Sequence, residues 1–229
     1  MVYLQNPAEY EELEEEYAWE KTYAQEAENR DRKRSWIKRV AHQVRVINYK
    51  LKKPANERFL KILGSGKILD VGCGDFLRWS DPFVPYGIEI SKSMSKTAHE
   101  KMAAKGGACV QGAGAEAIWE FNEDYFDSIM MHSYLEHETQ VAKILQGSHR
   151  CLKPGGKIFI RVPNYNALNR HISGAKWPGF RYPDHVNYFT VETLKSVAEK
   201  AGFEFKLVNR HKIWLDDNIQ ALFIKPNNT

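Results

Sequence analysis

The sequence contains few of the residues that mark several protein classes. Its three cysteines, Cys73, Cys109 and Cys151, lie far apart and form no Cys-x-x-Cys pair. This spacing argues against a zinc ribbon or a disulfide framework. No apolar run approaches the roughly 20 residues of a membrane span, and the acidic start of the chain has no apolar segment typical of a signal peptide. We therefore expect a cytoplasmic protein without a membrane span.

Charge is distributed unevenly, although the net charge is only +4. Residues 9–28 carry nine glutamates and one lysine, whereas residues 30–53 carry ten lysines or arginines. Apolar residues recur in the basic stretch at steps of three and four, which predicts a helix that packs by one face and exposes its charges. A nucleic-acid partner is the alternative, and we consider it the weaker one. We expect an N-terminal helical extension or lid over 1–53 and a catalytic domain over 54–229.

After residue 54 the pattern alternates between strand and helix. Apolar segments predict strands at about 67–71, 85–90, 107–111, 125–131 and 156–162. Two later segments, 203–207 and 218–224, follow a helix that Thr190 is placed to cap. Such alternation is typical of an α/β fold in which a largely parallel sheet of about seven strands carries helices on both faces.

A glycine turn follows the first of these strands. Gly72 and Gly74 allow a tight turn and close approach of a ligand to the backbone. Glu89 ends the next apolar run, where a carboxylate can accept two hydrogen bonds from a ribose diol. A dinucleotide site requires a third glycine, but Leu77 occupies that position, and the turn has no P-loop lysine. A nucleoside cofactor without phosphates, such as S-adenosylmethionine, fits this pattern better than NAD.

Here the chain resembles the class I S-adenosylmethionine-dependent methyltransferases, in particular the ubiquinone-type and small-molecule branch, over roughly residues 60–210. Five segments carry the resemblance in order: Leu69–Gly74, Ala113–Glu116, Tyr125–Met131, Leu135–His137 and Leu152–Ile160. The resemblance implies a Rossmann-like, doubly wound sheet with an antiparallel last strand. It also implies S-adenosylmethionine as cofactor and S-adenosylhomocysteine as product. The implied cofactor residues are Asp70, Gly72, Cys73, Gly74, Glu89, Ile90, Ala115, Glu116 and Met131.

One position departs from the family pattern. The family often has an acidic residue where this chain has Gly114, and that residue accepts a hydrogen bond from the adenine amino group. The adenine contact would then come from backbone groups near Ala115.

Three histidines are candidate catalytic residues on the acceptor side. His132 follows the predicted fourth strand, His137 comes one turn later, and His185 lies in the loop before the Thr190 helix. A hydroxyl acceptor benefits from a base that removes its proton as the new bond forms. Each histidine also has a purely structural alternative, in which it satisfies a helix cap or a backbone carbonyl.

Glu136, His137 and His185 together raise the possibility of a metal site, since carboxylate and imidazole groups bind Mg, Mn or Zn. The small-RNA 2′-O-methyltransferases resemble this layout, with a Glu-x-x-Glu-His run and a later histidine. This chain has Ser133 in place of the first glutamate. The incomplete set leads us to expect no metal, although a divalent ion remains an alternative.

The long segment between the fifth strand and the Thr190 helix indicates the kind of substrate. Loops of this length are usually functional, and this one carries the aromatic residues Tyr165, Trp177, Phe180 and Tyr182 beside several cations. These side chains suit a sugar, an aromatic ring or an anion, unless they only pack the segment onto the core. Its Pro183-x-His185 and Phe189-Thr190 pattern is similar to that of methyltransferases from sugar and polysaccharide pathways.

The favoured hypothesis is therefore O-methylation of a small molecule or a sugar or glycan intermediate by a monomer or homodimer. Two alternatives stay open: an RNA methyltransferase guided by the basic helix, and a non-catalytic methyltransferase-like binding subunit.

Overall fold

A computed structural model describes residues 2–3, 55–181 and 183–227 of the chain. Its strands are β1 (Val2–Tyr3), β2 (Gly66–Val71), β3 (Phe83–Glu89), β4 (Ala108–Gln111), β5 (Phe126–His132), β6 (Leu152–Pro163), β7 (Asn187–Tyr188), β8 (Glu204–Leu207) and β9 (Asn218–Ile224). Its α-helices are α4 (Ala55–Leu63), α5 (Lys92–Ala103), α6 (Gly114–Ala117), α7 (Val141–Cys151), α8 (Leu168–Ser173) and α9 (Val191–Lys200). Short 3-10 turns η1 (Ile118–Glu120), η2 (Gly174–Lys176) and η3 (Arg210–Lys212) complete the set.

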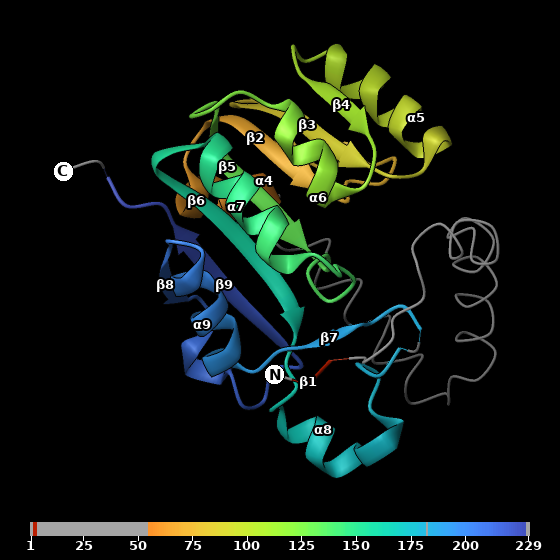
Figure 1. Ribbon diagram of the computed structural model, residues 1–229, viewed down its shortest axis with the longest axis vertical. Helices are drawn as coiled ribbons and strands as arrows, with labels where there is room; N and C mark the ends of the chain where they lie inside the picture. The colour runs from red at the N-terminus through yellow and green to blue at the C-terminus, as the bar shows by residue number, and fades with distance from the viewer. Residues whose placement is uncertain (1, 4–54, 182, 228–229) are drawn as a thin grey trace. The chain divides into compact units, whose positions relative to one another are not determined.

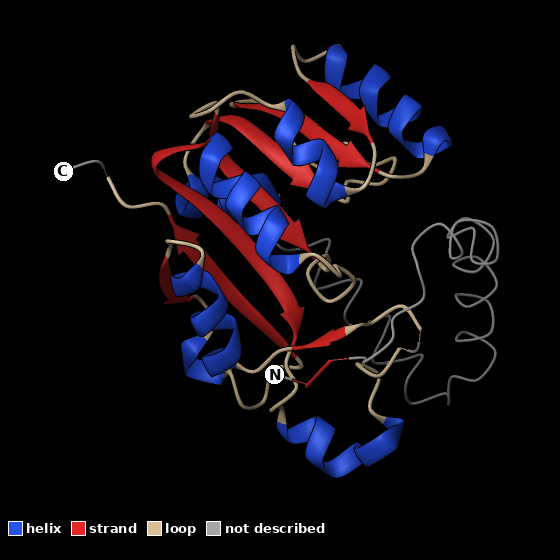
Figure 2. Cartoon of the chain, in the orientation of Figure 1, coloured by secondary structure: helices blue, strands red, loops and turns tan. Residues whose placement is uncertain are grey.

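Seven strands form the main sheet in the order β4-β3-β2-β5-β6-β9-β8, as Figures 1 and 2 show. The first five are mutually parallel, and β9 runs antiparallel to both β6 and β8. This confirms the predicted mostly parallel sheet with an antiparallel strand near its end. A separate pairing of β1 with β7 was not predicted, because two-residue strands have no readable periodicity.

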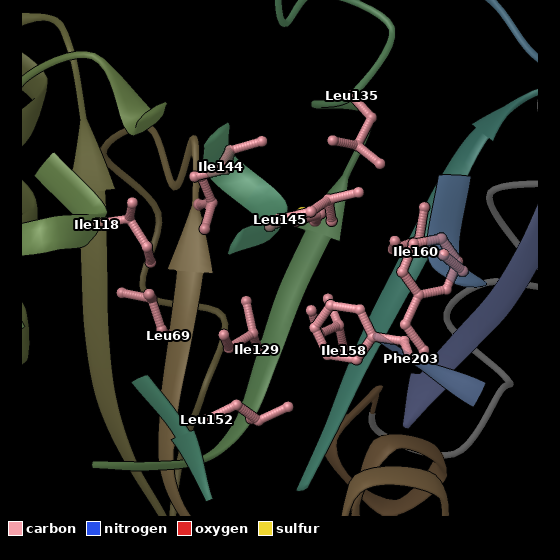
Figure 3. Packing of buried hydrophobic residues seen from close by; sticks show 14 of the residues in the cluster. Leu69, Ile118, Ile129, Leu135, Ile144, Leu145, Leu152, Ile158, Ile160 and Phe203 are labelled. Carbon is pink, nitrogen blue, oxygen red and sulfur yellow. The ribbon is translucent and has the colours of Figure 1, made fainter. Parts of the chain in front are cut away.

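Alternate residues of the central strands face opposite sides of the sheet, as strand geometry requires. On one side, Leu69 and Ile129 pack in a cluster with Ile144 and Leu145 of α7, part of which is shown in Figure 3. On the other side, the neighbouring residues Ile68 and Met130 join a second cluster. That second cluster also contains Phe59 and Leu63 of α4, Trp79, Phe83, Phe159 and Leu222. Helices therefore cover both faces of the sheet.

The helix before β8 begins as the sequence predicted. The Thr190 hydroxyl accepts a hydrogen bond from the Thr193 amide, and the Thr193 side chain in turn accepts one from the Thr190 amide. Such reciprocal capping satisfies amides that have no partner within the helix. The helical extension predicted for the N-terminus falls in residues 4–54 and lies outside the described residues. Among the described residues, no helix is long and apolar enough to cross a membrane.

Candidate active site

The glycine turn lies directly after β2, at the carboxyl end of the parallel strands. Gly72 and Gly74 have φ angles of 70° and 61°, a backbone region that residues with a Cβ rarely adopt. The Gly72 and Cys73 amides both donate to the Ile88 carbonyl oxygen, at 2.9 and 3.2 Å. A Cβ placed on Gly74 would have no heavy atom within 4 Å. The turn is thus held firmly to β3 and leaves space on its outer side for a ligand.

Glu89, the last residue of β3, holds this turn with its carboxylate. Its Oε2 accepts a hydrogen bond from the Gly74 amide at 2.8 Å, and its Oε1 accepts one from the Ser91 amide at 3.0 Å. Each carboxylate oxygen can accept more than one hydrogen bond, so both can also accept from a ligand. Ile90 follows Glu89, and its carbonyl accepts a hydrogen bond from the Gln111 side chain.

Asp70 and Cys73 are buried beside this turn. The Asp70 carboxylate accepts a hydrogen bond from Trp79 Nε1 at 3.1 Å and lies 3.9 Å from Arg78. Burial raises the pKa of Asp70 to about 6, while Arg78 and the Trp79 hydrogen bond act in the opposite direction. The Cys73 Sγ atom lies 3.7 Å from that of Cys109, and this contact together with burial raises the pKa of the Cys73 thiol.

The predicted adenine region is the short helix α6. Ala115 is fully buried, as is Met131 of β5, so a contact with adenine there would come from the main chain. The exposed Glu116 side chain pairs with Lys143, and that hydrogen bond lowers the pKa of Glu116. A Cβ on Gly114 would collide with the Tyr134 hydroxyl. An acidic side chain at this position would therefore require Tyr134 to move.

A tight turn follows β5 at the same edge of the sheet. His132 is the last residue of β5, and Ser133 has a positive φ of 57°. Asn187 of β7 holds the turn, because its side-chain amide donates to the Leu135 and Glu138 carbonyl oxygens at 3.0 and 2.6 Å. The Val186 and Asn187 backbone amides donate to the Glu136 carbonyl oxygen. Asn187 lies two residues after His185, and no pattern in the sequence indicates that its side chain holds this turn.

This contact brings three predicted residues together: Glu136, His137 and His185. The rings of His137 and His185 pack edge to face with centroids 4.7 Å apart. His137 Nδ1 lies 2.8 Å from the Asp184 carbonyl oxygen, and His185 Nδ1 lies 2.8 Å from the Gly179 carbonyl oxygen. One potential ligand atom from each of the three side chains lies within 4.8 Å of the other two.

Burial dominates the electrostatics of these three groups. It raises the pKa of Glu136 to about 7, against the opposing effects of a backbone hydrogen bond and Arg161. It lowers the pKa of His137 to about 4, and also that of His185 to about 4. Both imidazoles are therefore neutral at pH 7.

The aromatic residues of the long segment after β6 pack largely on one another. Trp177 is 2% exposed, and its ring lies 5.3 Å from that of Phe180 and 6.4 Å from that of Tyr165. The Arg170 guanidinium lies over the Tyr165 ring at 4.3 Å. These contacts favour the packing interpretation for Tyr165 and Trp177, whereas Phe180 is 38% exposed. Tyr182 is outside the described residues.

With this geometry established, comparison with known proteins identifies the family. A family model described as a methyltransferase domain matches residues 40–207, so the chain belongs to that family. The chain is 33% identical over 182 residues to a ubiquinone/menaquinone biosynthesis C-methyltransferase of Pectobacterium carotovorum, covering 65% of this chain and 67% of that protein. It is 26% identical over 165 residues to a ubiquinone biosynthesis O-methyltransferase of Bradyrhizobium, covering 64% of this chain and 65% of that enzyme.

A solved structure agrees with the fold. A SAM-dependent methyltransferase from Archaeoglobus fulgidus matches 74% of this chain and 92% of its own, with a TM-score of 0.57 and 20% identity. The alignments with curated relatives span between 45% and 69% of the lengths of those proteins. The chain is a class I methyltransferase with S-adenosylmethionine as its cofactor, and the cradle formed by Gly72, Gly74 and Glu89 fits that cofactor.

Proposed function

We propose that the protein methylates a hydroxyl oxygen of a small molecule or of a sugar or glycan intermediate. The observation that carries this proposal is the placement of Glu136, His137 and His185 after β5. Because β3, β2 and β5 are adjacent and parallel, their carboxyl ends share one edge of the sheet. The proposed acceptor side therefore lies at the same edge as the cofactor turn. The similarity to a ubiquinone biosynthesis O-methyltransferase supports oxygen as the acceptor atom.

The bound cofactor supplies an electrophilic methyl group on a sulfonium. Transfer of that methyl group to an acceptor hydroxyl would leave S-adenosylhomocysteine as product and would release the hydroxyl proton to a histidine of this chain. We assign Glu89 to the ribose hydroxyls and the Gly72–Gly74 turn, with Asp70, Cys73 and Ile90, to the rest of the cofactor. Ala115, Glu116 and Met131 are assigned to its adenine end. We assign His132, His137 and His185 to orienting the acceptor hydroxyl and taking its proton.

Cofactor binding is tested by Glu89→Ala. Loss of hydrogen bonds from a ribose diol to a carboxylate should weaken binding of S-adenosylhomocysteine by on the order of 2–4 kcal/mol, measured by calorimetry. Glu100→Ala, a change of an exposed carboxylate on α5, is the matched control. Equal affinity of both variants and the parent protein would contradict the assignment of Glu89.

The acceptor is tested by incubating the full chain with labelled S-adenosylmethionine and panels of phenols, sugars and RNA. Product mass spectra then assign the methyl group to oxygen, carbon or nitrogen. Transfer to a hydroxyl of a small molecule or sugar supports the proposal. Transfer to carbon, as the name of the Pectobacterium relative indicates for that protein, or selective transfer to RNA would overturn it.

A further inference from the structure

The fold compensates the buried carboxylate of Glu136 only in part, through the charge of Arg161 and a hydrogen bond from Ser133. The residue is 1% exposed, and among the described residues its Oε2 atom has no hydrogen-bond partner. A buried carboxylate oxygen without a partner is costly, and proteins usually offset such a group with an opposite charge or a coordinated metal. His137 and His185 lie close to the Glu136 carboxylate. A cation bound by all three side chains would compensate the negative charge of that carboxylate.

Both histidine rings are oriented by their backbone partners. Since a carbonyl oxygen only accepts hydrogen bonds, the contacts to Asp184 and Gly179 place the proton of each ring on Nδ1. The unprotonated Nε2 atom then carries the lone pair. Metal-binding histidines typically donate their other N–H to a carbonyl or carboxylate, which fixes the tautomer and the ring orientation. The two rings of this cluster have that arrangement.

We propose that Glu136, His137 and His185 bind one divalent transition-metal ion. Two imidazoles and one carboxylate are a ligand set that suits zinc and similar first-row metals. A tetrahedral site with bonds of about 2.1 Å holds its ligand atoms roughly 3.4 Å apart. Because these atoms lie within 4.8 Å of one another, each pair would have to close by at most about 1.4 Å to bind a metal in this geometry.

Ser133 was the reason that the sequence pattern predicted no metal. In the structure, the Ser133 hydroxyl accepts a hydrogen bond from Arg161 at 3.0 Å, so this position already has a structural role. Without a ligand at position 133, three remain: Glu136, His137 and the later His185, from a segment about fifty residues further on. A glutamate at position 133 is therefore not needed to assemble three ligands.

Three protein ligands leave a coordination position for water or a substrate oxygen. A metal there would polarise an acceptor hydroxyl and favour loss of its proton, which leaves His132 as the proposed proton acceptor. Only this assignment to the acceptor oxygen rests on the proposed function. Binding of the ion itself can be tested without an acceptor.

The test is a titration of the chelator-treated chain of residues 1–229. Binding of Co²⁺ is measured by visible absorption and binding of Zn²⁺ by calorimetry. We expect one metal per chain. Glu136→Gln and His185→Gln should each lower the affinity at least tenfold, while His211→Gln, a change of an exposed histidine outside the cluster, should leave it unchanged. Binding of S-adenosylhomocysteine reports whether each variant is folded, because its proposed residues lie on other elements.

The parent protein alone also tests the metal site. A metal ion that binds only the folded state raises the melting temperature, so added Zn²⁺ should raise that of the parent. Absence of saturable Co²⁺ and Zn²⁺ binding by the parent, or equal affinity in Glu136→Gln and His211→Gln, would overturn the metal site. If the parent protein binds neither metal and still transfers methyl groups in the presence of a chelator, His137 and His185 are assigned to proton transfer. Metal binding without methylation of any hydroxyl would support the site and contradict the proposed function.

Discussion

At the scale of single residues, the space around Gly114 leaves no room for a side chain. A Cβ at this position would collide with the Tyr134 hydroxyl and crowd Val71. We therefore expect Gly114→Ala to lower the free energy of unfolding by about 1–3 kcal/mol, the usual cost of overpacking, as measured by urea denaturation. In a Tyr134→Ala background the same change should cost much less, because the colliding atoms are gone. Equal costs in both backgrounds would show that Tyr134 is not the obstacle.

Asp70 gives stability a pH dependence with an unusual sign. Its folded pKa of about 6 lies above the ordinary value of 3.8, so the folded state retains a proton that the unfolded state loses. As pH rises from about 4 to 6, this group lowers stability, and the penalty is complete above pH 6, at roughly 3 kcal/mol. Asp70→Asn keeps an oxygen that can accept from Trp79 and removes the charge. The difference in free energy of unfolding, Asp70→Asn minus parent, should therefore be larger at pH 8 than at pH 4.

Denaturation of Asp70→Asn and the parent in urea at both pH values measures this change, and Glu100→Gln serves as an exposed control. A difference between variant and parent that is the same at pH 4 and pH 8 would contradict the raised pKa. The sequence indicated Asp70 as part of the cofactor motif but gave no sign of this burial. Trp79 and Arg78 reach Asp70 only after the loop that follows β2 has folded back.

At the scale of elements, the parallel strands could be predicted because alternate residues of each are buried on opposite faces. The place of Glu89 at the end of β3 could be predicted for the same reason, since it ends an apolar run; its role in cofactor binding stays a prediction. The link between β7 and the turn after β5 could not be predicted. It depends on backbone and amide groups of Asn187, which have no periodic signature and are brought together by a connection of about fifty residues.

Asn187 should therefore be important for the acceptor side. Asn187→Ala leaves two carbonyl oxygens of the turn without their donor, which should cost about 1–3 kcal/mol of stability. Affinity for S-adenosylhomocysteine should stay close to that of the parent, because the cofactor turn is held by β3 instead. Urea denaturation and calorimetry measure the two effects. Asn169→Ala, which removes exposed contacts to Asp217, is the control, and a similar loss of stability in both variants would argue against a special role for Asn187.

At the scale of the whole molecule, the first described residues of the chain contact the acceptor side. The pairing of Val2 and Tyr3 with Tyr188 and Asn187 joins the start of the chain to the strand that holds the acceptor-side turn. We propose that this pairing supports the acceptor-side turn and that residues 54–229 form the catalytic domain. A chain of residues 54–229 should then bind S-adenosylhomocysteine about as tightly as the full chain, because the residues assigned to the cofactor lie between Asp70 and Met131.

The same truncation should speed hydrogen–deuterium exchange over residues 185–190 and, once an acceptor is known, raise its KM or lower kcat. Since the family match begins at residue 40, a second truncation that keeps residues 40–229 separates two effects. If both truncated chains bind the cofactor product normally and both lose acceptor turnover, the first 39 residues are responsible. Loss of cofactor binding in the shorter chain alone would move the domain boundary back to residue 40, because residues 40–53 would then belong to the fold that supports the glycine turn.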